Sequence, residues 1–433
     1  MVFLFIHKKK LIKFSFFLFI LFLVFIPVFF LKAQTADELN SKISQKNQDI
    51  AKLEEEIRVY QDQLNTLSRQ KNSLNGSIQA LDITHKKLVA DIAVTQNKID
   101  KTNFKIESLS SQITTKEEAI ITSKNAIALE IKQTNEFELN NMVEILLSEH
   151  NFSSVWNDID TMATVYSRVR EQIIKLKQIK GQLEDTRNET INAKNELVIL
   201  KSNLADQKKI VDQNTRDKQK LLAQTKNSEA SYQKLLVDRE TKKAAFQKEL
   251  RDYESQLKYI LDPSKLPPGG VLSWPLENIF VTQYFGKTQA GKKLYANGTH
   301  NGVDFKASVG TPVMAMADGV VAGTGDTDIQ CSGVSFGRFV LIKYSNGLAS
   351  TFGHLSLIKV SIGERVVRGQ IVGYTGNTGY STGPHLHVSV YARDAVDIKS
   401  VPAKSCPGRI LTQPISPINA YLDPMYYLPP YKG

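Results

Sequence analysis

The chain has 433 residues and a formal net charge of +11, with 55 Lys and Arg residues against 44 Asp and Glu residues. The charge is uneven: residues 1–33 carry five lysines and no acidic residue, residues 264–433 carry 15 basic and 9 acidic residues, and residues 34–263 carry 35 of each sign. A long neutral middle segment is a poor partner for nucleic acid, so we expect no nucleic-acid binding. The basic C-terminal part suits a polyanionic wall or membrane surface.

The first 33 residues have the pattern of an export signal. Residues 14–31 form an almost unbroken apolar run, preceded by Lys8, Lys9, Lys10 and Lys13. Ala33 suits the last residue of a cleaved signal peptide, although Leu31 is larger than the small residue usual two positions earlier. The run is also long enough to span a bilayer core of about 30 Å with the lysines inside. We therefore expect an extracytoplasmic protein of the cell envelope, with residues 1–33 either cleaved or retained as a membrane anchor.

Residues 34–262 are predicted to form a coiled-coil stalk. No proline lies between Val28 and Asp262, and only Gly76 and Gly181 interrupt the segment after the signal. Large aliphatic residues recur at heptad position a of a first arm, including Ile43, Ile50, Ile57, Leu64, Ile78, Ile92, Ile99, Ile106, Ile113 and Ile120. Isoleucine at a with leucine at d favours a two-stranded coiled coil.

A second arm resumes the heptad at Val169 and continues, with more polar interruptions, to Ile260. Between the arms, residues 137–166 depart from the heptad and are richer in aromatic residues and methionine, which predicts a tip of shorter helices. The two arms pair either as an antiparallel hairpin or through a parallel coiled-coil dimer, and the sequence leaves both open.

From Pro263 the composition changes. Pro267-Pro268-Gly269-Gly270 predict a linker over residues 263–271, and short apolar strands then alternate with Gly, Asn and Asp turns. The predicted fold class is a long α-helical coiled coil followed by a mostly antiparallel β domain, residues 272–433, which ends in a tail. Cys331 and Cys406 lie in this domain. An even pair in an exported protein predicts a disulfide, with free buried thiols as the alternative.

Four of the seven histidines gather in this domain within about 90 residues, together with one aspartate: His300, Asp304, His354, His385 and His387. His385 and His387 are two apart in an apolar run, so both point to one face of a strand. His300 and Asp304 are too far apart in an extended strand to share a metal, so the chain must bend at Asn301-Gly302.

Imidazole nitrogens and carboxylate oxygens suit Zn²⁺, and a catalytic zinc keeps three protein ligands and one open position. Five candidates exceed that number, so two histidines remain for proton transfer. The domain's glutamates, Glu277 and Glu364, do not adjoin a histidine, so histidine must act as the general base. We expect His385 to be the base and His354 to be the acid or to stabilise the transition state, although the roles could be exchanged.

The motifs resemble those of the lysostaphin/LytM-type zinc metallopeptidases. H-x-x-x-D, an aromatic-x-His-Leu stretch and H-x-H occur in that order within about residues 272–392. The resemblance implies a small antiparallel sheet with a groove over one zinc ion, held by His300, Asp304 and His387 and flanked by His354 and His385. It also implies cleavage of peptide bonds in bacterial peptidoglycan. Relatives often carry Arg soon after Phe-Gly where this chain has Lys287, a departure that concerns substrate contacts and leaves the metal site intact.

Two function classes compete. The first is a zinc endopeptidase that cuts peptidoglycan in wall remodelling or cell separation, with its own stalk holding it inactive until a partner acts. The second is a non-catalytic activator of a cell-wall amidase, as in EnvC-like coiled-coil proteins that have lost ligands, whose tip docks a membrane complex of the FtsEX type. The stalk is common to both classes. The complete ligand set favours the enzyme.

Overall fold

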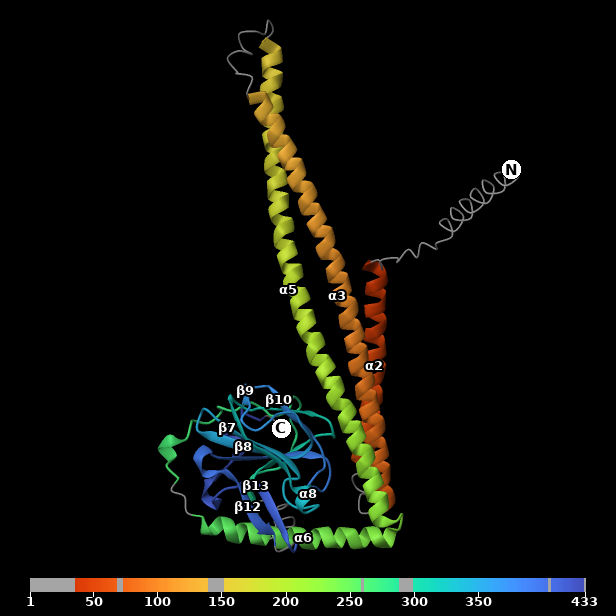
Figure 1. Cartoon of the computed structure of the whole chain (residues 1–433), viewed down its shortest axis with the longest axis vertical. Helices are drawn as coiled ribbons and strands as arrows, with labels where there is room; N and C mark the ends of the chain where they lie inside the picture. Colours follow the sequence, from red (N-terminus) through yellow and green to blue (C-terminus); the bar gives the residue numbers. More distant parts are fainter. Residues whose placement is uncertain are drawn as a thin grey trace, which may run out of the picture. The chain divides into compact units, whose positions relative to one another are not determined.

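The computed structural model of the protein describes residues 36–67, 73–138, 152–257, 261–287, 299–403 and 406–431. In these ranges four long helices precede a β domain, which confirms the predicted fold class (Figure 1). The helices are α2 (Ala36–Leu67), α3 (Leu74–Glu138), α5 (Phe152–Thr225) and α6 (Glu229–Gln256). The chain divides into two compact units, residues 1–44 with 104–188 and residues 45–103 with 189–433.

In the second unit, helices α3 and α5 run antiparallel to each other. Lys218 Nζ lies 2.5 Å from Asp82 Oδ1, and Ile210 packs with Leu88, so later residues of α5 contact earlier residues of α3. In the first unit α3 and α5 are joined by an ion pair of 2.7 Å between Glu117 and Arg187. The heptad seam is therefore satisfied inside one chain, as the hairpin alternative requires.

Neither arm is a single helix. α2 ends at Leu67 and α3 begins at Leu74 and turns back on it, with Lys46 paired to Asp100 at 3.0 Å and Lys98 to Glu54 at 3.9 Å. The predicted first arm therefore consists of two helices, and the heptad stripe from Ile43 to Ile120 is divided between them.

The second arm breaks after α5. Lys226 and Asn227 have φ values of 49° and 55°, in the left-handed region, so the chain turns before α6 starts at Glu229. Of the expected tip, residues 139–151 lie outside the described residues, and residues 152–166 are the first turns of α5. The expected signal or anchor also lies outside them. Within the described ranges, no helix combines the length and the apolar character needed to cross a bilayer.

The β domain consists of short strands with tight turns. The strands are β1 (Val281–Gln283), β2 (Gly286–Lys287), β3 (Thr299–His300), β4 (Val303–Lys306), β5 (Pro312–Met314), β6 (Gly319–Asp326), β7 (Arg338–Tyr344), β8 (Leu348–Ile358), β9 (Arg365–Val366), β10 (Ile371–Thr375), β11 (His385–Ala392), β12 (Asp397–Ala403), β13 (Arg409–Ile415) and β14 (Tyr421–Leu422). Short helices are α8 (Thr327–Gln330), α9 (Pro424–Tyr427), and three 3₁₀ turns at Pro263–Lys265, Arg393–Ala395 and Ile418–Ala420.

The main sheet has the order β1-β4-β11-β8-β7-β6-β9, and all its pairs are antiparallel; β10 pairs with β5 and β8, and β14 pairs with β11. Its inward-facing residues form a core that includes Phe305, Ile342, Phe352 and Val388, each fully buried. The expected linker and tail contact each other, since Gly270 N donates to Tyr426 O at 3.1 Å. This rigid sheet holds β4, β8 and β11, which carry the candidate site.

Within the second unit, helices α3 and α5 also pack against the main sheet. Leu88 on α3 and Ile210 on α5 are each 1% exposed and pack with Tyr374 on β10. Beside them Lys359 Nζ lies 2.7 Å from Asp206 Oδ2. A separate hairpin, β12 with β13, is linked to the loop after α8 by the Cys331–Cys406 disulfide.

Candidate active site

Three side chains from neighbouring strands bring one ligand atom each to a common point. His300 Nε2 lies 3.1 Å from His387 Nδ1 and 3.3 Å from Asp304 Oδ1. His387 Nδ1 lies 2.8 Å from the same carboxylate oxygen. All three residues are buried, on β3, β4 and β11. The residues that sequence motifs assign to a metal therefore do converge.

The convergence follows from strand register and one turn. Asp304 on β4 and His387 on β11 are directly opposite each other in the antiparallel ladder. The chain reverses between β3 and β4 at Asn301-Gly302. A Cβ atom at Gly302 would lie 2.6 Å from His387 Cε1 and 2.5 Å from Val388 O, so this turn requires glycine for close approach.

Hydrogen bonds to the far nitrogens fix which atom of each imidazole faces the centre. His300 Nδ1 donates to Tyr284 O at 3.1 Å, which leaves the Nε2 lone pair inward. His387 Nε2 donates to Ser389 Oγ at 2.9 Å, and Ser389 Oγ donates to Asn301 O at 2.8 Å, which leaves Nδ1 inward. Two lone pairs and a carboxylate oxygen thus point at one another, an arrangement that a cation between them stabilises.

The spacing suits zinc. With bonds of about 2.0–2.1 Å in a tetrahedron, neighbouring ligand atoms lie about 3.3 Å apart. The three separations here are 2.8, 3.1 and 3.3 Å. Two imidazoles and one carboxylate are also a ligand set typical of zinc hydrolases, and three ligands leave one tetrahedral position open. The residues present therefore fit Zn²⁺.

His354 and His385 lie beside the three converging side chains. Their ring centroids are 4.6 Å apart, and each Nδ1 lies 2.8 Å from a backbone carbonyl, Thr378 O and Gly383 O respectively. Both Nε2 atoms are therefore left as proton acceptors. His354 has φ of 61°, unusual for a residue other than glycine, and this backbone directs its ring from β8 toward the centre. His385 Nε2 lies 3.7 Å from Asp304 Oδ1.

Burial and neighbouring groups set the charges. Burial raises the pKa of the Asp304 carboxyl, but hydrogen bonds and positive charge from His300 and His387 outweigh it and hold the pKa well below its usual value. Burial, assisted by charge on neighbouring histidines, lowers the pKa of His354 and of His387. These shifts favour the carboxylate form of Asp304 and the neutral form of His387, the forms that bind a divalent metal.

Comparison with known proteins places this centre in a family. The family described as Peptidase family M23 matches residues 298–398, which contain all five of these side chains. The chain carries a peptidase M23 domain. Peptidoglycan DD-endopeptidase ShyA of Vibrio cholerae is 43% identical over 94 residues, 22% of this chain and 20% of the relative. Glycyl-glycine endopeptidase ALE-1 of Staphylococcus capitis is 44% identical over 90 residues, 21% of this chain and 24% of the relative.

The family match covers residues 298–398, and the chain spans only a small part of the length of its curated relatives. Matches to the curated relatives span between 18% and 28% of their lengths. The lysostaphin catalytic domain from Staphylococcus simulans is 29% identical and covers 34% of this chain and 90% of that domain, with a TM-score of 0.25. The long helices and most of the β12–β13 hairpin lie outside residues 298–398, the range of the family match.

Helix α6 forms one wall of the pocket into which the M23 site opens. His300, His354 and His387 line this pocket together with Phe336, Tyr380 and Tyr421. The opposite lining comes from six residues of α6: Lys243, Phe246, Gln247, Leu250, Arg251 and Glu254. In Figure 1 the helix runs along the side of the domain that carries β12 and β13. The approach to the site is therefore covered by a segment of the same chain.

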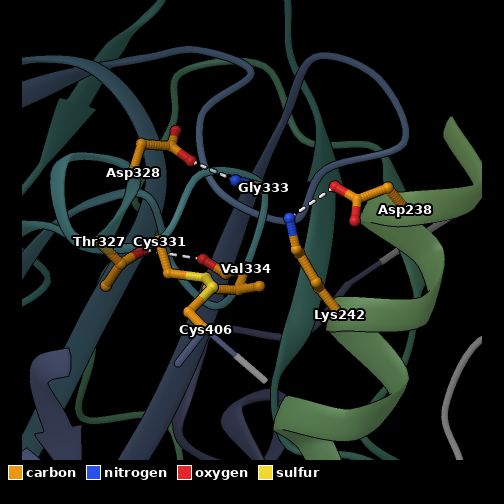
Figure 2. Close-up of a disulfide and its surroundings, with 8 residues drawn as sticks. All are labelled: Asp238, Lys242, Thr327, Asp328, Cys331, Gly333, Val334 and Cys406. Atoms are coloured by element: carbon orange, nitrogen blue, oxygen red, sulfur yellow. Dashed lines mark hydrogen bonds and ion pairs between the residues drawn. A yellow bond between two sulfur atoms is a disulfide. The ribbon is translucent and has the colours of Figure 1, made fainter. Parts of the chain in front are cut away.

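The docking surface for α6 is the hairpin and the loop to which it is linked. Phe246, 3% exposed, packs with Val334, Leu411 and the two half-cystines. Figure 2 shows the disulfide beside the α6 turns that carry Asp238 and Lys242. Residues beyond 398, where the M23 match ends, thus supply much of the contact that holds α6 over the site.

Two ionisable groups of α6 are buried in this interface. Glu254 Oε1 accepts a hydrogen bond from Tyr421 OH at 2.7 Å, and burial raises the pKa of its carboxyl to about 7 despite Arg251 nearby. Lys243 Nζ lies 3.4 Å from the centroid of the Tyr380 ring, and burial lowers its pKa to about 8 although Glu240 opposes the change. Docking therefore disfavours the charged form of both groups.

We expect the docking of α6 to be weakest between pH 7 and pH 8. As pH falls from about 7 toward 4.5, the ordinary pKa of a glutamate, Glu254 becomes protonated in the docked state and docking strengthens. As pH rises from about 8 toward 10.5, the ordinary pKa of a lysine, Lys243 loses its proton in the docked state and docking strengthens again. The Glu254 contribution amounts to about 3 kcal/mol. Docking is measured as fluorescence energy transfer between a donor and an acceptor attached at the exposed positions Val237 and Ile410, as urea is added. Glu254→Gln should abolish the acid-side change alone, and pH-independent docking would contradict the assignment.

The sequence predicted the five side chains that lie together here, but it did not predict that helix α6 lines the pocket above them. The heptad that runs from Val169 to Ile260 places Phe246 and Tyr232 on the coiled-coil seam, whereas Phe246 packs on the β domain and the Tyr232 hydroxyl lies 2.6 Å from Ser77 Oγ. The Lys226-Asn227-Ser228 stretch before an acidic residue is a helix-start pattern and could have signalled the break.

Proposed function

We propose that the protein is an exported zinc metalloendopeptidase that hydrolyses peptide bonds of bacterial peptidoglycan in wall remodelling or cell separation. The observation that carries this proposal is the convergence of His300, Asp304 and His387 beside two further histidines with free Nε2 atoms. The names of the relatives, a peptidoglycan DD-endopeptidase and a glycyl-glycine endopeptidase, support the substrate class. The lysine cluster and apolar run before residue 33 support export.

His300, Asp304 and His387 would hold the ion, and Zn²⁺ in such a site lowers the pKa of water and polarises a carbonyl. His385 accepts the proton of the attacking water, because its Nε2 is free and lies near the ligand carboxylate. His354, whose Nδ1 is held by Thr378 O, can act as the acid only after its Nε2 has taken up a proton released from the attacking water; it then stabilises the developing charge or returns that proton to the leaving amine. The buried walls exclude bulk water and strengthen these interactions.

We further propose that α6 keeps the cleft closed until it is displaced. Six of its residues line the pocket that contains the site, so docked α6 would restrict the approach of a peptide chain to the histidines. A membrane complex that binds the residues 137–166 region is the expected source of displacement. A coiled-coil dimer is not needed for this arrangement.

Zinc content and muropeptide release test the proposal. The chain lacking residues 1–35 is compared as wild type, with Phe246→Asp to free α6, and with His387→Ala added to that variant. We expect one zinc per chain, muropeptide release that rises with Phe246→Asp, and loss of both with His387→Ala. His85→Ala serves as the control. Full zinc without cleavage would exclude this substrate, and absence of zinc would favour the amidase activator.

A further inference from the structure

Lys243 presents an ammonium group to the wall of the active-site pocket. The residue is 5% exposed, and its Nζ lies 3.4 Å from the centroid of the Tyr380 ring. Burial disfavours the ammonium form of Lys243, and the face of the Tyr380 ring offsets part of that cost through its quadrupole. The Tyr380 ring face is therefore a cation site that this chain fills with its own lysine.

The ring is positioned by the M23 domain and not by α6. Tyr380 N donates to Ser335 O at 2.9 Å, and Gly379 N donates to Asp328 Oδ2 at 2.7 Å. Gly379 and Gly337 approach so closely that a Cβ on Gly379 would lie 2.1 Å from Gly337 N. This loop immediately precedes the H-x-H strand, so the backbone that carries Tyr380 is held relative to the site without any contact from α6.

The same pocket contains the ring and the site. His300, His354 and His387 line it together with Tyr380 and Lys243. A ligand that replaces α6 therefore meets both the reacting centre and the ring face. Lys243 marks the place on that ring where a primary ammonium fits.

We propose that Tyr380 determines substrate specificity by binding a free primary ammonium group of the peptide substrate, in the place that Lys243 occupies when α6 covers the cleft. The proposal rests on the proposed function, since it names a chemical feature of the peptide cut at that site. It predicts a preference for wall peptides whose diamino residue keeps its side-chain amine free.

The test uses the chain with Phe246→Asp, in which α6 is freed, and peptidoglycan whose free amines are either intact or N-acetylated. We expect the intact substrate to be hydrolysed about tenfold faster, as for a desolvated cation over an aromatic ring. Adding Tyr380→Leu should remove this difference by slowing hydrolysis of the intact substrate alone, and Tyr380→Phe should preserve it because the ring face remains. Tyr426→Leu, an exposed tyrosine outside the pocket, is the control.

Equal rates on the two substrates, or a preference that survives Tyr380→Leu, would overturn the proposal. A second readout separates it from the proposed function. Binding of Nα-acetyl-L-lysyl-D-alanyl-D-alanine and of its Nε-acetyl form is measured by calorimetry on the same variants. If no peptidoglycan is hydrolysed, the proposed function fails. The cation site is still supported if the peptide with the free amine binds about tenfold more tightly and Tyr380→Leu removes this preference. Equal affinity for the two peptides refutes the cation site.

Discussion

Replacing His385 with alanine is expected to lower kcat by about 10²–10⁴-fold while leaving one zinc per chain, because proton transfer is lost and the three ligands remain. The His385 ring lies 4.6 Å from that of His354, and its Nε2 is free for the proton of water because Nδ1 is held by Gly383 O. Hydrolysis is followed in the Phe246→Asp chain, where the cleft is open, across the pH range.

The pH profile distinguishes the two histidines. A general base must be unprotonated, so its loss should abolish the acidic limb of the profile, whereas loss of the acid should abolish the basic limb. We expect the first result for His385→Ala and the second for His354→Ala. The opposite pattern would exchange the roles, and loss of zinc in His385→Ala would show that His385 is a ligand.

The chain carrying Phe246→Asp should hydrolyse peptidoglycan about a hundredfold faster than wild type. Phe246 is the buried apolar anchor of α6, 3% exposed against Val334 and Leu411. Loss of a buried phenylalanine costs about 3 kcal/mol or more, equivalent to about a hundredfold in the ratio of docked to free helix, and a carboxylate in this apolar contact adds to the cost. The rates of muropeptide release are compared at equal zinc content.

Val237→Asp is the matched control. It introduces the same charge on the same helix, but Val237 is 65% exposed, so docking should be unaffected. Equal rates for wild type and Phe246→Asp, with α6 shown to be undocked by energy transfer, would mean that the helix does not limit access to the site.

Local patterns predicted two pairs of site residues, each held together by local geometry. Two histidines two apart in an apolar run share a strand face, and Asn301-Gly302 supplies the reversal that brings His300 back to Asp304. The proximity of these two pairs to each other and to His354 required the resemblance to known motifs, since the pairing of β11 with β4 and with β8 is a long-range feature that no spacing encodes.

The helical part was predicted less well. A heptad specifies which side of a helix is buried, but not what covers it. The stripe from Ile43 to Ile120 is shared by two antiparallel helices, and the stripe that includes Phe246 meets a sheet domain. Lys243 and Glu254 look like solvent-facing charges in the sequence, and only the docked helix shows them buried.

The disulfide also acts on the unfolded chain. Cys331 and Cys406 are 75 residues apart, and the loop they close contains His354, His385 and His387. Closing a loop of that length removes chain entropy worth about 4.5 kcal/mol from the unfolded state. This is a large share of the roughly 5–15 kcal/mol that separates folded from unfolded domains. Folding of the domain should therefore be strongly favoured where thiols are oxidised, and a chain kept in a reducing compartment would remain much easier to unfold.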